Sequence, residues 1–479
     1  MTSRQIAIVV AAAGLAALAA AGSALARNPH CAGGIQYVVG GLRDKDKGLT
    51  EDYQRQMAKA LDQLTQCAAE DPADLEAIGY LAWAYAEVDS SRLAGETFAR
   101  VIEGLKAKGD RKKAEWAANN RDSYWANAFN DGIAKINDAQ QAYPDFTKAP
   151  ENEADQTLRE EARKKYEAAM ASLTRAANLR PGHPQTIRSL GSVHYFMGDF
   201  KTAREVFADG LRQAPGDSLL TESLKNATTA LGNQLIDQKK YDEAITTFEA
   251  LTRSEPGNAD LFVGLASAYF SRASEGSDAA AKKSDYKAAG DAYAKAAALR
   301  TTAADLPFNA ALAYQRAGEY ATAEAHWKAS LALAPDDTDA LAALAETLAE
   351  QKKFDEAVTV LHQAVLKDGK NKNLHRQLGA VYSKAGNNAK STEELLVFLA
   401  LHQGTAAADP AAAARAAKAG SAAANALASL GAPDQVNDWT GDNQKYQTWF
   451  YWSKKLALHF NAEGAQAAKS DWSTTGQKK

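Results

Sequence analysis

The residues that could support catalysis or hold a metal ion are few and widely spaced in this chain. Its histidines are His30, His183, His194, His326, His362, His375, His402 and His459. Acid–base catalysis and metal binding need several such side chains in a recognisable pattern, and no histidine here has a ligand-like neighbour in the sequence. The paired carboxylates Glu393 and Glu394, and Asp336 and Asp337, are expected at helix ends or on solvated faces, where acids cap or solvate a helix.

Motifs with a known chemical mechanism are missing from the sequence as well. It contains no HExxH, GxSxG or GxxxxGK[ST] motif, and no GxGxxG between a strand and a helix. Its two cysteines form neither CxxC nor a multi-cysteine metal spacing. We therefore expect no catalytic residue, no cofactor and no metal, and we interpret the chain as a binding protein rather than an enzyme.

The amino terminus has the pattern of an export signal. Arg4 precedes an uncharged apolar run over residues 6–21, and Ala24-Leu25-Ala26 gives the small-x-small pattern that a signal peptidase accepts. We expect a signal peptide over residues 1–26 with cleavage after Ala26. The alternative is a retained amino-terminal membrane anchor, because residues 6–26 are just long enough to span a bilayer.

Export would make a disulfide between Cys31 and Cys67 possible, and these are the only cysteines. We predict this disulfide. The alternative is that Cys67 replaces a small core residue while Cys31 remains a free thiol near the amino terminus.

Composition excludes several protein classes. With 46% hydrophobic and 24% charged residues, the 479-residue chain is neither disordered throughout nor a multi-span membrane protein. Its formal net charge of −4 argues against nonspecific nucleic-acid binding. Only 12 prolines are present, which favours long, uninterrupted helices.

A repeat of 34 residues organises most of the sequence. Large apolar residues recur at Tyr293, Trp327, Leu361 and Leu395, and alanines recur at the same step at Ala289, Ala323 and Ala357. A longer motif shared by two repeats includes Gly198-Asp199-Phe200 in one and Gly318-Glu319-Tyr320 in the other. This pattern resembles the tetratricopeptide repeat, whose helix pairs need small residues at close crossings and glycine at the intervening turn.

This resemblance implies a mainly α fold, an α-solenoid of about eight tetratricopeptide helix pairs. The expected parts are a 27–49 amino-terminal segment, a 50–405 superhelix, a 406–429 alanine-rich linker and a 430–479 tail module; the alternative for the alanine-rich stretch is a poorly anchored helix. Three insertions interrupt the repeat: residues 138–161 predict an extended surface loop, residues 218–224 one extra helical turn, and residues 271–284 a longer link between two helices.

The tail changes from a helical period to a period of two, which predicts a small antiparallel β meander. Leu456, Leu458 and Phe460 should share one face, and the tail's aromatic residues should pack on the preceding helix or, alternatively, on a partner. The segment also resembles, over barely fifty residues, a short β-module of bacterial envelope proteins such as the small lipoprotein of the outer-membrane barrel-assembly machinery. That resemblance favours an envelope location.

The remaining functional prediction is a concave groove lined by the first helix of each repeat. Its candidate residues are Arg188, Ser192, Tyr195, Phe196, Asn226, Thr229, Asn233, Phe270, Phe308, Arg316, Glu346, Arg376 and Lys384. Aromatic, amide and charged groups mixed in this way suit an extended peptide or a partner protein. We therefore expect an exported, non-enzymatic scaffold for protein–protein interaction in the cell envelope. The alternative is an outer-membrane assembly or structural factor that docks peripherally through the aromatic tail.

Overall fold

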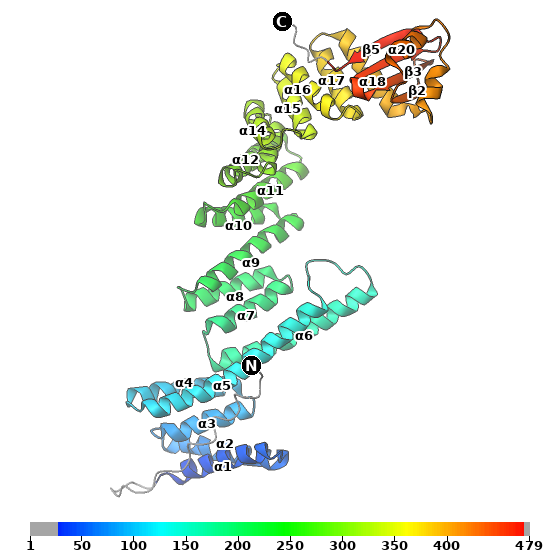
Figure 1. Cartoon of the computed structure of the whole chain (residues 1–479). Helices are drawn as coiled ribbons and strands as arrows, with labels where there is room; N and C mark the ends of the chain where they lie inside the picture. The colour runs from blue at the N-terminus through cyan, green and yellow to red at the C-terminus, as the bar shows by residue number, and fades with distance from the viewer. Residues whose placement is uncertain (1–26, 474–479) are drawn as a thin grey trace. The chain divides into compact units, whose positions relative to one another are not determined.

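The computed structural model describes residues 27–473, so the predicted signal peptide lies outside the described residues. The chain forms two compact units, one ending at Ala227 and one beginning at Thr228, which we call unit 1 and unit 2. Among the described residues, α-helices predominate and the strands are confined to the carboxy-terminal part, as Figure 1 shows. The expected helical-repeat fold with a small β meander is therefore confirmed. No helix in the described part has the length and apolar character needed to cross a membrane.

Unit 1 is built from helix pairs. Its helices are α1 (Pro29–Asp46), α2 (Thr50–Glu70), α3 (Leu75–Glu87), α4 (Ser91–Ala107), α5 (Arg111–Ala142), α6 (Glu153–Leu179), α7 (Pro184–Phe196) and α8 (Phe200–Gln213), followed by α9 (Ser218–Asp237), which continues into unit 2. The pairs α1–α2, α3–α4, α5–α6 and α7–α8 are in contact. The predicted superhelix begins at residue 50, whereas in the structure α1, within the expected amino-terminal segment, already pairs with α2.

Unit 2 continues the same arrangement. Its helices are α10 (Tyr241–Ser254), α11 (Ala259–Glu275), α12 (Ala279–Leu299), α13 (Asp305–Arg316), α14 (Tyr320–Leu333), α15 (Thr338–Glu350), α16 (Phe354–Lys367), α17 (Lys372–Lys384) and α18 (Asn388–Gln403). From α10 to α17 each helix contacts the next, and α18 packs on α17. Trp327 of α14 lies fully buried in their shared core, at the large apolar position predicted by the repeat.

Three successive repeats of unit 2 have a residue with positive φ at the turn between their two helices. Gly318, Lys352 and Gly386 occupy this position at successive steps of 34 residues, with φ values of 76°, 62° and 78°. Glycine adopts this backbone conformation without steric cost, whereas lysine does not. The turn therefore keeps one geometry even where the sequence lacks glycine.

The insertion in the second repeat differs from its prediction. The expected loop over residues 138–161 is largely helical, because α5 continues to Ala142 and α6 begins at Glu153. Asn152 accepts a hydrogen bond from Asp155 N at 2.9 Å, and Glu153 and Asp155 place negative charge at the helix start. Acidic residues in this position stabilise a helix amino terminus, so the run of acids starts α6 instead of extending the loop. Of the longer link predicted over residues 271–284, only residues 276–278 lie between α11 and α12.

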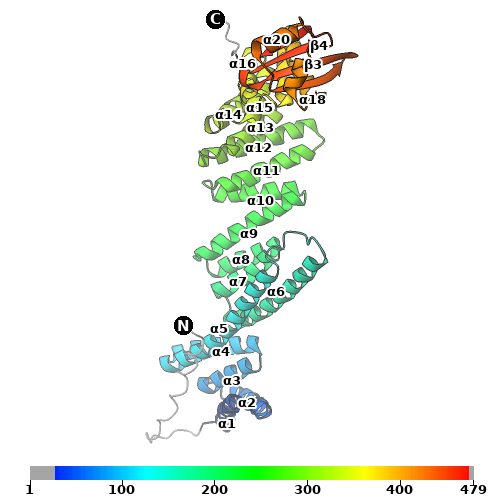
Figure 2. The same ribbon diagram turned by 45° about the vertical axis from the view of Figure 1, so that its right-hand side comes forward.

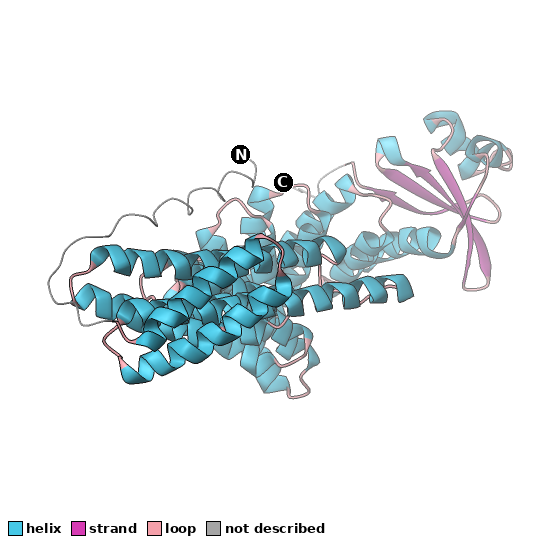
Figure 3. Ribbon diagram, turned by 90° about the horizontal axis from the view of Figure 1, so that it is seen from below, coloured by secondary structure: helices cyan, strands magenta, loops and turns pink. Residues whose placement is uncertain are grey.

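The carboxy-terminal strands form one antiparallel sheet with the order β1-β2-β3-β4-β5, shown in magenta in Figure 3. They are β1 (Thr405–Ala406), β2 (Gln435–Gly441), β3 (Gln444–Tyr451), β4 (Leu456–Asn461) and β5 (Gln466–Asp471), with a 3-10 turn at Trp452–Lys454. The sheet confirms the predicted meander.

Alternation along the strands gives the sheet two buried faces. Trp439, Phe450 and Trp472 pack with the core that includes α18, whereas Leu456, Leu458 and Phe460 share the opposite face, as predicted. That second face is covered by α19 (Pro410–Arg415) and α20 (Ala422–Leu430), and Figure 2 shows α20 beside β3 and β4. The segment predicted as a linker over residues 406–429 is therefore a structural layer of the module, because its alanines let short helices approach the sheet closely.

Candidate binding site

The first helices of the repeats in unit 2 bring three of the predicted groove residues together. Glu346 on α15 and Arg376 and Lys384 on α17 line one pocket of about 230 Å³. We call it the α15–α17 pocket. Its lining comprises Ala342, Glu346, Ala349, Glu350, Leu361, Arg376, Gln377, Ala380, Val381 and Lys384. The acids come from α15 and the bases from α17, with small apolar side chains between them.

Two of the four charged groups already face each other across the pocket. Lys384 Nζ donates to Glu350 Oε1 at 3.0 Å, which ties α17 to α15. Glu346 Oε2 accepts a hydrogen bond from Gln315 Nε2 at 3.1 Å, and within residues 27–473 its negative charge has only this neutral amide as a partner. Surface ion pairs of this kind contribute at most about 1 kcal/mol to stability, so a ligand can replace them at little cost.

Arg376 and Gln377 carry hydrogen-bonding groups that have no partner among the described residues. Arg376 is exposed, and within residues 27–473 its guanidinium makes no ion pair or hydrogen bond. Gln377 Oε1 is buried and has no hydrogen-bond partner in the described part of the chain. A guanidinium presents several donors in a fixed plane, which suits carboxylate and carbonyl oxygens. The pocket therefore combines an unused donor, an unused acceptor and an apolar floor.

The two aromatic candidates of unit 2 are packing residues. The Phe270 ring lies edge-on to Tyr286 with centroids 5.1 Å apart, and Phe308 lies edge-on to Trp327 at 4.8 Å. Both are half-buried against the core of unit 2. Arg316 is exposed at the end of α13 and is not part of the α15–α17 pocket.

The other groove candidates lie on two helices. They are Arg188, Ser192, Tyr195 and Phe196 on α7, and Asn226, Thr229 and Asn233 on α9. Tyr195 packs edge-on against Phe200 with centroids 5.1 Å apart, and Phe196 packs on a neighbouring core cluster. Asn226 and Asn233 are exposed. None of these residues lines the α15–α17 pocket.

Sequence reasoning missed part of the pocket lining. Glu350 follows Glu346 by four residues on α15, and Ala380 follows Arg376 by four residues on α17. Residues four apart share a helix face, so this spacing was a usable signal. No spacing marked Gln377, because the adjacent residue Arg376 had already been chosen as the groove candidate on that turn of α17.

Glu394 corrects an expectation, because it is neither a cap nor solvated. Glu394 Oε2 lies 2.8 Å from His375 Nδ1, and Glu394 Oε1 accepts a hydrogen bond from Trp472 Nε1 at 3.0 Å. His375 Nε2 lies 2.8 Å from the Gly369 carbonyl oxygen, and both Glu394 and His375 are buried. The two ring nitrogens of His375 therefore face a carboxylate and a backbone carbonyl oxygen. We call His375, Glu394 and Trp472 the buried triad.

Two other polar residues have clear local partners. Asp337 caps α15 by accepting hydrogen bonds from the backbone of Asp339 and Ala340, both at 3.0 Å. His194 is half-buried, with Nδ1 3.4 Å from Asp199 Oδ2 at the turn between α7 and α8. Both residues therefore serve the local structure of a repeat.

The carboxylate of Glu324 on α14 also has a structural role. Lys328 and Lys353 donate to the two carboxylate oxygens of Glu324 at 2.6 and 2.7 Å. These hydrogen bonds lower the pKa of Glu324 to about 2. The lysines are partly exposed, and the carboxylate connects α14 to the start of α16.

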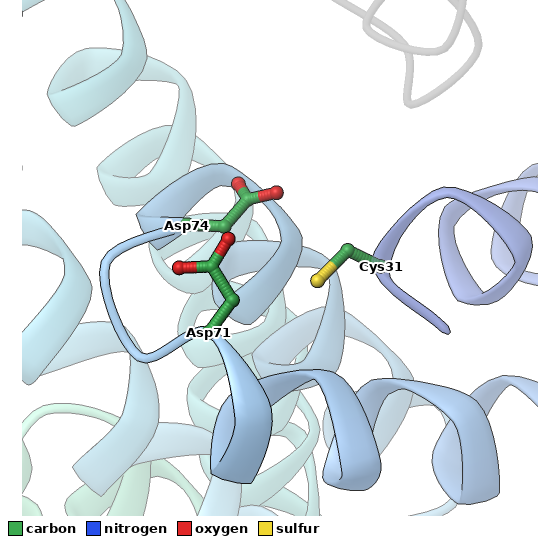
Figure 4. Close-up of side chains that lie close together, drawn as sticks. All are labelled: Cys31, Asp71 and Asp74. Carbon is green, nitrogen blue, oxygen red and sulfur yellow. The ribbon is translucent and has the colours of Figure 1, made fainter. Parts of the chain in front are cut away.

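Three potential ligand atoms converge at the first helix pair, but they do not form a metal site. Figure 4 shows Cys31, Asp71 and Asp74 close together. Cys31 is joined to Cys67 in a disulfide, with Cα atoms 4.9 Å apart, so its sulfur is not a thiolate. Asp74 accepts two hydrogen bonds from Arg27, at 2.6 and 2.8 Å, and caps α3 through Ala77 N. Disulfide, ion pair and cap account for the cluster.

Solved structures similar to this chain include several repeat proteins. "YrrB: a TPR protein with an unusual peptide-binding site" is 18% identical, with a TM-score of 0.32, and the match covers 42% of this chain and 93% of that one. A thermophilic TPR protein from Thermus thermophilus is 23% identical, with a TM-score of 0.27, and the match covers 42% of this chain and 100% of the other. A MamA protein from Desulfovibrio magneticus RS-1 is 17% identical, with a TM-score of 0.27, and covers 43% of this chain and 97% of its own.

The comparison with curated proteins gives no significant match. Family models described as tetratricopeptide repeat match residues 229–304 and residues 315–381. The second match includes Glu346 and Arg376 of the α15–α17 pocket and ends three residues before Lys384. These segments of unit 2 are therefore tetratricopeptide repeats, and most of the candidate pocket lies within one of them.

Proposed function

We propose that this chain is an exported, non-enzymatic tetratricopeptide-repeat scaffold of the bacterial cell envelope, which binds an extended segment of another protein. The observation that carries the proposal is the α15–α17 pocket, where Glu346, Arg376 and Lys384 from two first helices surround an apolar floor. Groups of both charges around small apolar side chains suit a peptide, which offers carbonyls, amides and side chains in alternation.

Export is supported by two features. The leader sequence over residues 1–26 has the charge, apolar run and cleavage pattern of a signal peptide. The two cysteines of the chain are paired with each other, as suits an oxidising compartment. We propose that the mature chain begins at Arg27. Mass spectrometry of its amino-terminal peptide tests this, because recovery of residues 1–26 in the membrane fraction would instead support a retained anchor.

Docking at the outer membrane through exposed tail aromatics is a weaker second proposal. Trp439, Trp449 and Trp472 are buried inside unit 2, so most of the aromatic surface that would make such contacts is already covered by the chain itself. Trp452 remains partly exposed. We therefore favour the repeat pocket over the tail aromatics as the principal binding site.

A site-specific photocrosslinking experiment tests the proposed function. A photoreactive amino acid replaces Ala380, which is exposed and lines the α15–α17 pocket, in the full chain expressed in cells. The matched control replaces Ala329, which is also exposed, on the second helix α14, and lines no part of this pocket. A third variant places the group at Lys454 in the tail.

We expect one recurrent protein adduct from the Ala380 variant, cross-linked through a single short segment. The Ala329 variant should give no such adduct. Identical adducts at Ala380 and Ala329 would contradict the pocket as the binding site. Adducts found only at Lys454 would support tail docking instead.

A further inference from the structure

A second pocket of about 260 Å³ lies where the turn between α16 and α17 meets the carboxy-terminal sheet. Its apolar wall comes from Val365 and Leu366 at the end of α16 and from the rings of Trp452 and Trp472. We call it the tail pocket. It shares no lining residue with the α15–α17 pocket and is not used by the proposed function. The pocket can hold one or two side chains. Its volume is below the range of about 300–1,000 Å³ that is typical of small-molecule sites.

The charge at the rim of the tail pocket is mainly positive. Lys367, Lys370 and Lys455 line it, against one carboxylate, Asp368. Lys367 pairs with Asp336, whereas Lys370 and Lys455 have no ion-pair partner within residues 27–473. The Lys370 ammonium lies 5.7 Å from the centre of the Trp452 ring. Two uncompensated ammonium groups therefore flank an apolar wall.

Both walls of the tail pocket are held in place from behind by the buried triad. His375 Nε2 lies 2.8 Å from the carbonyl oxygen of Gly369, and this hydrogen bond fixes the turn between α16 and α17. Glu394 bonds to His375 and also receives the Trp472 indole N–H, which fixes the aromatic wall. Trp472 N in turn donates to the Lys455 carbonyl oxygen at 2.8 Å. A pocket whose walls are fixed before binding loses less entropy when a ligand enters.

The lining favours an acidic peptide over a sugar. The residues that line the pocket include one carboxylate, Asp368, and no side-chain amide. Few groups are therefore available to form hydrogen bonds with the many hydroxyls of a saccharide. A peptide needs less: one apolar side chain against Val365 and Trp472, and carboxylates within reach of Lys370 and Lys455. Such charge complementarity steers binding and selects the partner.

We propose that the tail pocket binds a segment of a partner protein in which an apolar side chain is flanked by acidic residues. The apolar side chain enters between the end of α16 and the two tryptophans, and the flanking carboxylates pair with Lys370 and Lys455. This site lies beyond the proposed function and does not depend on it.

The test measures binding of a labelled synthetic peptide, acetyl-Asp-Glu-Leu-Asp-Glu-amide, to the purified full chain by fluorescence polarisation. The comparison peptides replace the acids with Asn and Gln, or the central Leu with Gly. The pocket variant is Lys370→Glu with Lys455→Asn. Its matched control, Lys201→Glu with Lys418→Asn, changes the net charge equally at two exposed lysines outside the tail pocket.

We expect the pocket variant to raise the dissociation constant of the acidic peptide at least tenfold and the control variant to leave it within about twofold. The conservative pair Lys370→Arg with Lys455→Arg should retain binding, which separates loss of charge from loss of folding. Both comparison peptides should bind at least tenfold more weakly.

Three results would overturn this proposal. One is equal affinity for the acidic and amide peptides, and another is equal weakening by the pocket and control variants. The third is binding of oligogalacturonate, but not of the peptide, in a manner that depends on Lys370, which would assign the pocket to an acidic polysaccharide. Arg376→Glu in the α15–α17 pocket should leave peptide affinity unchanged, so failure of this proposal is distinguishable from failure of the proposed function.

Discussion

The repeats of unit 2 and its carboxy-terminal module are stabilised in different ways. Between α11 and α17 the core consists mainly of alanines and leucines around a few large side chains such as Trp327. The face of the sheet that packs on α18 instead contains buried polar groups: Asn437 donates to the Ala400 carbonyl oxygen, and Trp472 donates to Glu394. The apolar contacts between repeats use the same residue types from one repeat to the next. The two polar contacts of the module each join one particular pair of residues.

This difference predicts unequal sensitivity to substitution. Apolar cores tolerate changes that preserve volume, whereas a buried polar group left without its partner costs the full desolvation penalty. Substitutions that remove polar atoms should therefore distinguish the two regions. The following predictions compare matched residues in each.

Replacing Glu394 with alanine should give the largest effect. The variant leaves His375 and Trp472 without their carboxylate partner in a buried site, and each buried polar group left unpaired costs about 1–3 kcal/mol. Urea denaturation measures the free energy of unfolding, and hydrogen exchange locates the loss in β3 to β5. The matched control is Glu324→Ala, whose lysine partners reach water and should make the cost about 1 kcal/mol. Equal losses would contradict the comparison.

Acidification between pH 6.5 and about 5 should weaken the module more than the repeats, where burial lowers the pKa of His326 and His362 less than it lowers that of His459. Burial lowers the pKa of His459 from 6.5 to about 3, so below pH 6.5 the unfolded state binds a proton that the folded state excludes. The module should lose about 2 kcal/mol between pH 6.5 and about 5. Glu324, with its pKa lowered from 4.5 to about 2, destabilises the repeats only below pH 4.5. Urea denaturation at a series of pH values checks this, and His459→Asn should flatten the loss above pH 4.5.

Tryptophan-to-phenylalanine substitutions compare one residue type in both regions. Trp472→Phe leaves Glu394 Oε1 without its donor, whereas after Trp327→Phe the remaining partners still bond, because Thr347 Oγ1 donates to Gln315 Oε1 at 3.0 Å. We expect Trp472→Phe to reduce the free energy of unfolding by about 1–2 kcal/mol more than Trp327→Phe. Urea denaturation measures both losses. A larger loss for Trp327→Phe than for Trp472→Phe would show that packing of the ring matters more than its hydrogen bond in the module as well.

The repeats and the module also differ in how far the sequence predicts them. Tyr293, Trp327 and Leu361 recur at one spacing, so their roles follow from periodicity. Trp472 meets Glu394 across 78 residues, and no pattern connects them. The alanine-rich composition allows a helix over residues 406–429, but the packing of α19 and α20 on the sheet is recognisable only once the sheet face that they cover is known.

The candidate site shows the same division. Glu346, Arg376 and Lys384 were predicted from their place on first helices, and they do meet in one pocket. Phe270 and Phe308 occupy equivalent positions but pack against neighbouring rings. Periodicity identifies the helix face, whereas the sizes of neighbouring side chains decide whether a residue on that face is available to a ligand.

The smallest predicted effect is the stability change caused by replacing Lys352 at the repeat turn. Lys352 has a φ of 62°, where its neighbours at the same repeat position are glycines. Lys352→Gly should increase the free energy of unfolding by about 0.5–1 kcal/mol because glycine adopts this conformation without strain. Ala329→Gly in the middle of α14 is the control and should lower it by about 1 kcal/mol. A loss of stability in both variants, measured by thermal unfolding, would contradict the strain at this turn.

The central claim is that a partner segment binds in the α15–α17 pocket. The most direct measurement is the dissociation constant of the cross-linked partner for the full chain and for a variant with Glu346→Arg and Arg376→Glu, which exchanges the charges while preserving net charge. The control exchanges charges at Arg204 and Glu205, exposed on α8. We predict at least a tenfold weaker complex for the pocket variant and an unchanged one for the control. Equal affinity of the native chain and the pocket variant would contradict the claim.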